Sequence, residues 1–209
     1  MLTKEEINNQ KERFNRLAAE INREGAAQLL SWLNSSDFFS APASTRFHSS
    51  FEGGLCRHSL FVYDRLIKRL DEIRAYYPNV SDKELNEKLA VSALLHDVCK
   101  VDFYKTDYKN QKVYKSSGSK YDSNGNFDWE TVEFYTIDEK LPFGHGEKSV
   151  YIIQSFMQLK RDEAAAILAH MGDFSDQKTS KIFDMFPLAV FLHIADLEAS
   201  HLDEMNGNT

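Results

Sequence analysis

The residue types that bind transition metals occur in this chain as an ordered set. An adjacent His96-Asp97 pair ends an apolar segment, and Lys100 follows just beyond it. Further candidate ligands precede and follow the pair, namely His58, His145, His170 and Asp196. Imidazole and carboxylate groups are zinc ligands, and a metal held by them makes a nucleophile from water at neutral pH. The set therefore predicts a metal centre with hydrolytic chemistry.

His96, Asp97 and Lys100 fall within about one quadrant of a predicted helix, which has ~3.6 residues per turn. One helix face then offers an imidazole, a carboxylate that can bridge two metals, and a cation for a phosphate oxygen. In a simpler interpretation, the pair only ends the helix and Lys100 complements the helix dipole. The apolar approach over 91–95 favours the functional interpretation, because it drives the pair into the interior, where a charge needs a partner.

Two of the other histidines lie beside glycines. Gly53 and Gly54 precede His58, and glycines let the backbone turn sharply into a helix start. Glycines also flank His145, which places it in a loop or at a helix start where backbones can approach closely. Each histidine has a structural alternative, because a histidine at the start of a helix is commonly not a ligand.

The last two candidates lie in predicted helices. His170 closes an alanine-rich helix, where the helix dipole would stabilise an imidazolium even without a metal. Asp196 lies among apolar neighbours, so its carboxylate is costly unless it is paired or metal-bound. We expect His193, three residues before Asp196, to have a supporting or packing role.

Composition limits the class of protein. The chain has 209 residues, 42% of them hydrophobic and 27% charged, which is enough for a single soluble domain over 1–209. Its net charge of −7 argues against long nucleic acid as a partner, since that binding depends on Lys and Arg at phosphates. A small phosphorylated substrate remains compatible, because a bound dication reverses the local field.

Cysteines and termini point to the cytoplasm. Cys56 and Cys99 form no C-x-x-C motif, and we expect reduced thiols. Cys99 could lie near the site, but we expect it to point into the core. The charged residues 1–6 lack an apolar signal region, and the apolar stretches are too short to span a membrane. We therefore expect a cytoplasmic protein without a membrane partner.

The spacing of apolar residues predicts a mostly helical chain. The expected helices cover about 4–23, 25–33, 55–76, 81–97, 146–159, 162–170 and 186–201. Capping boxes begin at Thr3 and Ser81. The stretch 34–54 is predicted as a loop, so residues 1–45 form N-terminal helices followed by a loop.

Residues 102–142 differ in character and predict a β-hairpin insertion. Asn124-Gly125 is a hairpin-turn signal, with strands expected at 113–114 and 131–135. Aromatic residues of the insertion form one wall of a nucleotide pocket or pack the hairpin on the body; they are Tyr104, Tyr108, Tyr114 and Phe134. The predicted fold class is all-α with an inserted hairpin.

The ligand order resembles that of the HD-domain superfamily of metal-dependent phosphohydrolases, over about residues 46–200. The superfamily pattern, with the two extra histidines of its binuclear subset, matches His58, His96-Asp97, His145, His170 and Asp196. Residues 53–60 are also similar to the G-G-L-x-x-H-S/T of an HD group that includes a bacterial exoribonuclease. The chain lacks that enzyme's OB domain and the Gly-Tyr-Pro signature of HD-GYP domains, so the resemblance implies the superfamily and neither subgroup.

This resemblance implies an HD-type helical bundle around the metal site. It implies one metal on four residues, His58, His96, Asp97 and Asp196. It also implies that Asp97 bridges to a second metal on His145 and His170, and that Lys100 contacts the substrate phosphate. Asp97 and Lys100 would be the catalytic residues. The implied reaction is hydrolysis of a phosphoester in a small nucleotide-like substrate, as in a phosphodiesterase or nucleotidase.

The metal and the substrate contacts are less closely specified. Histidine-rich ligation suits one or two ions of Mn, Fe, Co, Ni or Zn better than Mg. Arg46 and His48 precede the first ligand and could reach substrate from a loop, and Lys148 could do so after His145. The alternatives for each are a surface position or a solvated helix start. Two other functions remain open: an HD-fold di-iron oxygenase, and a non-catalytic nucleotide-binding or sensor module.

Overall fold

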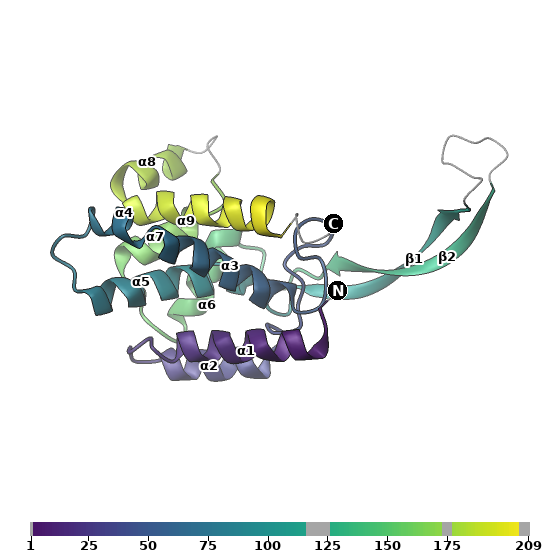
Figure 1. The fold of residues 1–209 in the computed structure, drawn as a ribbon, viewed down its shortest axis with the longest axis horizontal. Coiled ribbons are helices and arrows are strands. Elements are labelled where there is room, and N and C mark those ends of the chain that lie inside the picture. Colours follow the sequence, from purple (N-terminus) through teal and green to yellow (C-terminus); the bar gives the residue numbers. More distant parts are fainter. Residues whose placement is uncertain (1, 116–125, 173–176, 205–209) are drawn as a thin grey trace.

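The computed structural model describes residues 2–115, 126–172 and 177–204, which form a helical body and a β-hairpin that stands out from it (Figure 1). The α-helices are α1 (Lys4–Ala18), α2 (Ala26–Ser35), α3 (Gly54–Lys68), α4 (Leu70–Arg74), α5 (Asp82–Leu95), α6 (His145–Gln154), α7 (Arg161–Ala169), α8 (Gln177–Met185) and α9 (Pro187–Glu198). A 3-10 helix η1 (Val98–Lys100) follows α5, and a short π-helix η2 (Ala199–Asp203) follows α9. A helical class with an inserted hairpin is therefore confirmed.

Helix α5 carries the His96-Asp97 pair and lies inside the body. Ser81 caps its N-terminus by accepting a hydrogen bond from the Glu84 N–H at 3.2 Å. From Lys88 onward every residue of α5 is buried, and burial continues through the pair. The helix packs against α1, α3 and α7, and both α3 and α7 pack against α9. The apolar approach thus delivers the pair to the interior, as predicted.

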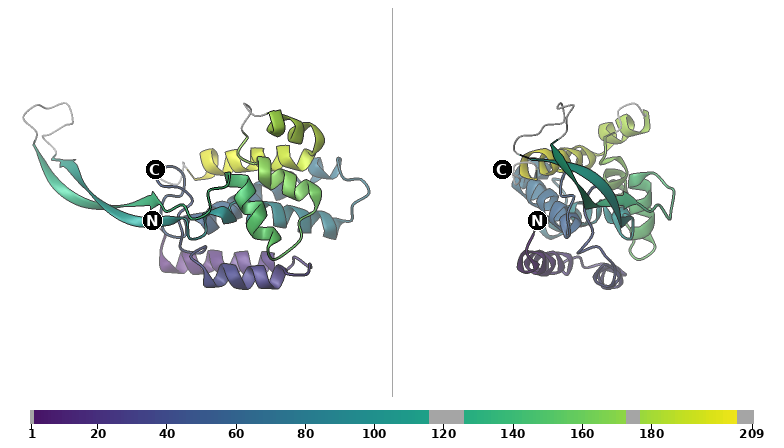
Figure 2. Two further views of the ribbon diagram at one scale, coloured as in Figure 1. Left: turned by 180° about the vertical axis from the view of Figure 1, so that it is seen from behind. Right: turned by 90° about the vertical axis from the view of Figure 1, so that its right-hand side faces the viewer.

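Helices α1 and α2 form a layer along one side of the body (Figures 1 and 2). The capping box of α1 is present, with the Thr3 N–H donating to Glu6 Oε2 at 2.7 Å. Phe14 of α1 is fully buried against the loop that follows α2, with ring centroids 4.9 Å from Phe38 and 5.5 Å from Phe39. This packing fixes the loop that leads into α3.

Apolar side chains from this layer and from the central helices belong to one connected core. Its fully buried members include Leu55 of α3, Leu94 of α5, Ile167 of α7 and Leu192 of α9. The core therefore joins the helices that carry the predicted ligands. Among the residues described, no helix has both the length and the apolar character that crossing a membrane requires.

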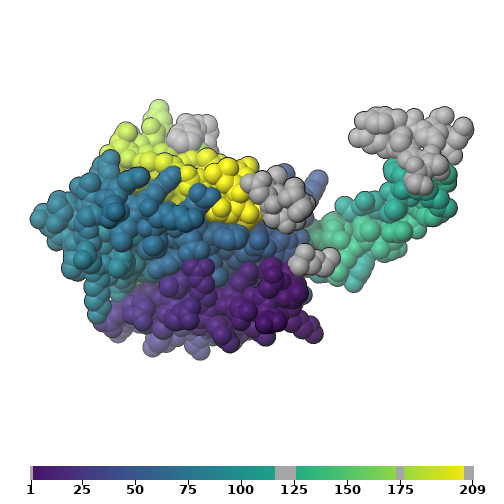
Figure 3. Space-filling model, viewed as in Figure 1, coloured from purple at the N-terminus to yellow at the C-terminus, as the bar shows by residue number. Residues whose placement is uncertain are grey.

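Strands β1 (Tyr104–Tyr114) and β2 (Phe127–Ile137) pair antiparallel along their whole length. At the base, the Tyr104 hydroxyl donates to the Ala43 carbonyl at 3.2 Å. Beyond the base the hairpin runs clear of the body (Figures 2 and 3), and Tyr108 is 66% exposed there. The strands are longer than predicted. The predicted turn at Asn124-Gly125 lies outside the described residues.

Several helix boundaries differ from the sequence prediction. The predicted helix over 55–76 is divided into α3 and α4 at Arg69, whose φ of −102° departs from helical values. Helix α8 was not predicted, because its sequence is mostly polar and only Ile182 and Phe183 pack on the core. The predicted helix over 81–97 ends at Leu95, which changes how the following residues are presented.

Candidate metal centre

The predicted metal ligands come from separate helices and meet at one place. They are His58 in α3, His96 and Asp97 just after α5, His145 at the start of α6, His170 just after α7, and Asp196 in α9. The Asp97 carboxylate and the imidazoles of His58, His96 and His170 are at most 2% exposed. Burial of so many polar side chains at one point indicates a built site, since such groups are costly inside a protein unless they are partnered.

Glycines set up two of these positions. Gly53 has a φ of +80° at the turn into α3, and a Cβ on Gly54 would lie 2.0 Å from the Ser49 carbonyl oxygen. A Cβ on Gly146 would lie 2.3 Å from the Leu168 carbonyl oxygen, so this glycine allows α6 to approach the end of α7. That approach places the rings of His145 and His170 with centroids 5.3 Å apart.

The Asp97 carboxylate lies between two pairs of histidines. Its Oδ1 atom is 2.7 Å from His145 Nε2 and 3.5 Å from His170 Nε2. Its Oδ2 atom is 3.5 Å from the Nε2 atoms of both His58 and His96. One carboxylate thus faces both halves of the site, which is the arrangement that a bridging ligand requires.

Lys100 lies beside the same carboxylate, with Nζ 2.6 Å from Asp97 Oδ2. Because the chain continues as the 3-10 helix η1 and not as an α-helix, it turns every ~3 residues, which aligns positions i and i+3. The single helix predicted for this segment is wrong, yet the two side chains still meet. Burial alone would lower the pKa of Lys100, but the Asp97 carboxylate raises it above its usual range. Lys100 therefore stays charged.

Three histidines are oriented by a hydrogen bond that the Nδ1–H of each ring donates. His96 Nδ1–H donates to the Ala93 carbonyl at 2.8 Å, and His170 Nδ1–H donates to the Ile167 carbonyl at 2.6 Å. His58 Nδ1–H donates to Glu204 Oε1 at 2.7 Å. Metal-binding histidines usually make such bonds to a carbonyl or carboxylate, because these bonds aim the Nε2 lone pair at the metal.

The Nε2 atoms of these three histidines face other candidate ligands or no hydrogen-bond partner at all. His170 Nε2 is buried and has no hydrogen-bond partner among the described residues. His58 Nε2 lies 3.1 Å from both His96 Nε2 and Asp196 Oδ1. Buried polar atoms without partners are rare, and a cation here would satisfy these atoms together. The buried His, Asp and Cys groups could therefore hold a metal ion.

A metal binds neutral imidazoles and ionised carboxylates, and the shifted pKa values favour these protonation states for His96 and Asp97 but not for His58. Burial lowers the pKa of His96 to about 3, which keeps this imidazole neutral. Burial alone would raise the pKa of Asp97, but Lys100 and His96 hold it well below its usual range. Although burial opposes it, Asp196 and Glu204 raise the pKa of His58 to about 10. A metal on His58 must therefore displace a proton.

A cavity of about 330 Å³ opens at the centre. Its lining includes Lys100, Asp97, Asp196 and Tyr104, with the histidines His48, His58, His145, His170, His193 and His201. The remaining histidine of the seven in the chain, His96, contacts His58. All seven lie in the part of the chain that the structure describes, so the whole histidine content of this acidic chain gathers at one cavity.

The three predicted substrate contacts have different positions. His48 lines the cavity, and its ring centroid is 5.0 Å from that of His58. Arg46 is exposed and lies outside the lining. Lys148 is buried, but its Nζ lies 2.6 Å and 2.5 Å from the Glu139 carboxylate oxygens and also lies outside the lining. The structure thus brings His48 to the cavity, whereas solvent or Glu139 surrounds the other two cations.

The sequence analysis did not identify Glu204, whose carboxylate accepts the hydrogen bond from the outer ring nitrogen of His58. Glu204 is 6% exposed and follows η2. A signal was available, because Glu204 follows Asp196 by about two helical turns and so continues its face. His193 was expected to have a supporting role, and its Nδ1–H does donate to the His170 carbonyl at 2.7 Å.

Cys99 was expected to point into the core, and it is 3% exposed, but it also contacts one of the predicted ligands. Its sulfur lies 3.4 Å from His145 Nε2 and 3.5 Å from His145 Nδ1. Its backbone N–H donates to Ser149 Oγ at 3.2 Å. The cause is again the tighter turn of η1, which aims residue 99 differently from a continued α-helix. Burial raises the pKa of the Cys99 thiol to about 12.

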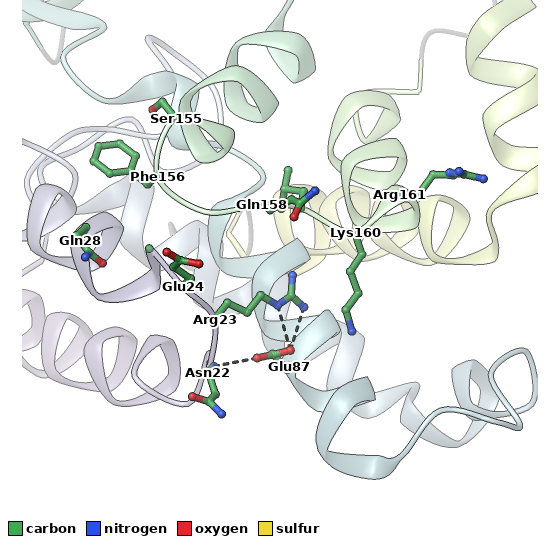
Figure 4. Close-up of a pocket in the computed structure, with 12 residues that line it drawn as sticks. Asn22, Arg23, Glu24, Gln28, Glu87, Ser155, Phe156, Gln158, Lys160 and Arg161 are labelled. Atoms are coloured by element: carbon green, nitrogen blue, oxygen red, sulfur yellow. Dashed lines mark hydrogen bonds and ion pairs between the residues drawn. The ribbon is translucent and has the colours of Figure 1, made fainter.

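A larger groove of about 1280 Å³ lies elsewhere, beside the turn before α2 and the segment between α6 and α7 (Figure 4). There the Arg23 guanidinium lies 3.0 Å from Glu87 Oε2 and 2.6 Å from Glu163 Oε2. Lys160 Nζ is 2.5 Å from Glu84 Oε1. The groove is larger than the cavity, but Arg23, Glu87 and Lys160 of its lining are already engaged in ion pairs.

Converging ligand atoms, one buried nitrogen without a hydrogen-bond partner and the collected histidines therefore make the cavity the candidate functional site. Its helices bring together every predicted ligand. No protein-family model, curated protein or solved structure matches this chain.

Proposed function

We propose that this chain is a metal-dependent phosphohydrolase of the HD-domain superfamily. The observation that carries the proposal is the position of Asp97, whose two carboxylate oxygens face two different pairs of histidines. The ligand order along the sequence and the mostly helical fold support the same assignment.

In this proposal one metal is held by His58, His96, Asp97 and Asp196, and a second by Asp97, His145 and His170. The nitrogen and oxygen donors suit Mn, Fe, Co, Ni or Zn better than Mg. When bound, such ions act as Lewis acids toward a phosphoryl oxygen and make hydroxide available at neutral pH.

The chain's own residues bind and orient the substrate phosphate. The charged Lys100 ammonium lines the cavity and can donate to a phosphoryl oxygen. Burial raises the pKa of Tyr104 to about 12, so its hydroxyl keeps its proton, which it donates to the Ala43 carbonyl, and this bond holds the ring as part of the cavity wall. Burial lowers the pKa of His48, so its ring is neutral at pH 7 and serves as a hydrogen-bonding group.

The size and charge of the cavity indicate the substrate class. A volume of about 330 Å³ is at the small end of the range for ligand sites, roughly 300–1,000 Å³. Imidazole and ammonium groups outnumber carboxylates in its lining, although the chain carries a net charge of −7. We therefore assign a small nucleotide-like phosphoester, and not a long nucleic acid, as the substrate.

The test begins with metal content. The chain is loaded with Mn²⁺, desalted and subjected to elemental analysis, and phosphate release from nucleotide monoesters and diesters is then measured. Two metals per chain with manganese-dependent hydrolysis support the proposal. His170→Ala is expected to lose only the second metal, whereas the exposed control Arg161→Ala keeps both.

The remaining outcomes separate the alternatives. Oxygen consumption by iron-loaded protein without phosphate release would favour the di-iron oxygenase. Tight nucleotide binding without turnover under any metal would favour the sensor module. A chain that binds no metal would refute the proposed centre.

A further inference from the structure

The two cysteines of the chain lie in different environments. Cys56 lies in α3 and belongs to the apolar core cluster. Cys99 is also buried, at 3% exposure, but its sulfur lies beside the His145 ring and follows Asp97 by two residues. Cys99 can therefore take part in metal binding, whereas the apolar surroundings of Cys56 offer no other ligand among the described residues.

The distances around Cys99 match a shared metal. The ligand atoms of Asp97, Cys99 and His145 all lie within 4.8 Å of one another. In a tetrahedral zinc site, bond lengths of ~2.3 Å to sulfur and ~2.0–2.1 Å to nitrogen put neighbouring S and N atoms about 3.6 Å apart. The His145 nitrogen that faces Asp97 is Nε2, and its observed separation from Cys99 Sγ is 3.4 Å.

A second, independent observation points to the same place. His170 is fully buried, and its Nε2 atom has no hydrogen-bond partner within the described part of the chain. This atom is aimed at Asp97 Oδ1, 3.5 Å away, which is also the oxygen that contacts His145. Asp97 Oδ1 therefore lies between His170 Nε2 on one side and the group formed by Cys99 and His145 on the other.

We propose that Cys99 is a thiolate ligand of the metal on the His145 and His170 side of the centre, so that this side selects a thiophilic ion such as Zn²⁺ over Mg²⁺ or Mn²⁺. The inference rests on the metal centre of the proposed function and adds a ligand that the resemblance to the HD superfamily does not imply. On binding, the metal–sulfur bond forms, the S–H bond breaks and the proton passes to solvent, with no change in oxidation state.

The experiment uses the full chain loaded with Co²⁺ alone and records its absorption spectrum. A bound cobalt ion gives visible d–d bands, and a thiolate ligand adds a sulfur-to-cobalt charge-transfer band in the near ultraviolet. The charge-transfer band is expected in the unmodified chain and in the matched control Cys56→Ser. It is expected to be lost in Cys99→Ser while the d–d bands of bound cobalt persist.

Zinc affinity gives a second readout. Losing a residue that only supports a ligand costs about 10- to 100-fold in metal affinity. Cys99→Ser should therefore weaken Zn²⁺ binding by at least that factor and leave Mn²⁺ binding nearly unchanged.

The outcomes distinguish this inference from the function proposal. Bound cobalt without a charge-transfer band in the unmodified chain would overturn the role of Cys99 and leave the metal centre standing. A chain that binds no cobalt would overturn both. If Cys99→Ser does not fold, X-ray absorption of the zinc-loaded unmodified chain decides, because a sulfur neighbour is either present or absent.

Discussion

The groove beside Arg23 and the cavity at Asp97 differ in size and in chemistry. The groove of Figure 4 measures about 1280 Å³, whereas the cavity at Asp97 measures about 330 Å³. In the groove, Arg23 lies between the carboxylates of Glu87 and Glu163, so the charges are neutralised within the protein. In the cavity, ligand atoms converge and one buried nitrogen lacks a partner. The convergence of candidate ligand atoms, and not volume, therefore distinguishes the candidate site.

The contrast also assigns different roles to the buried charges. The groove network ties the turn before α2 to α5 and α7, which is a structural task. In the cavity, backbone carbonyls and Glu204 hold the outer nitrogens of three histidines and leave the inner ones available. Substitutions in the groove should thus change stability without changing chemistry, whereas substitutions in the cavity should act first on metal binding and chemistry.

The largest effect is expected for His96→Ala. The variant removes an imidazole whose Nε2 lies 3.1 Å from that of His58, so metal at this half should be lost and hydrolysis should fall to the metal-free background. Elemental analysis and phosphate release measure the two effects. Full metal content in the folded variant would show that His96 is not a ligand.

Arg23→Ala should have the next largest effect, on stability. It leaves the fully buried Glu163 carboxylate without its closest cation, and breaking such a pair costs about 3–5 kcal/mol. Lys88 Nζ, 3.8 Å from Glu163 Oε1, should keep the loss near the lower end. Urea unfolding measures the change, and Arg161→Ala is the exposed control. A loss of metal binding without a loss of stability would show that the groove does not have the purely structural role assigned to it.

Lys100→Met should lower kcat/KM by about 10²- to 10³-fold, as expected for removing one charged donor at a phosphoryl group. Metal content should stay unchanged, because the variant keeps every predicted ligand. Without metal the variant should unfold more easily, since Asp97 loses the ammonium 2.6 Å away. Steady-state kinetics and paired melts with and without Mn²⁺ measure these effects. An unchanged kcat/KM would exclude Lys100 from substrate binding.

Glu204→Gln should have the smallest effect. The amide oxygen can still accept from His58 Nδ1–H, but the negative charge that makes His58 a stronger ligand is lost. We expect metal affinity to fall by about tenfold, the lower end of the range for such supporting groups. Competition with a chelator measures the affinity. An unchanged affinity would mean that Glu204 serves only to pack the end of the chain described here.

That the candidate ligands come together could be predicted from the sequence, because local signals mark their positions. Glycines at 53, 54 and 146 and the apolar run into His96 are features of neighbouring residues, and each corresponds to a helix end in the structure. The helical class could be predicted for the same reason.

Other features depend on tertiary contacts that no local pattern encodes. The pairing of Lys148 with Glu139 neutralises a cation that the sequence offered to substrate. The direction of Cys99 depends on η1 replacing a helical turn. Helix α8 has too few apolar residues to be predicted without the core on which it packs. These side chains are set by distant neighbours, so their spacing in the sequence carries little information.

The gathering of all seven histidines at one cavity has a spectroscopic consequence. Selective ¹⁵N labelling of histidine would make the imidazole region of an NMR spectrum a view of this centre alone. Ring ¹⁵N shifts distinguish tautomers and metal-bound nitrogens, so each coordination bond could be followed ion by ion. No substitution and no activity assay would be needed.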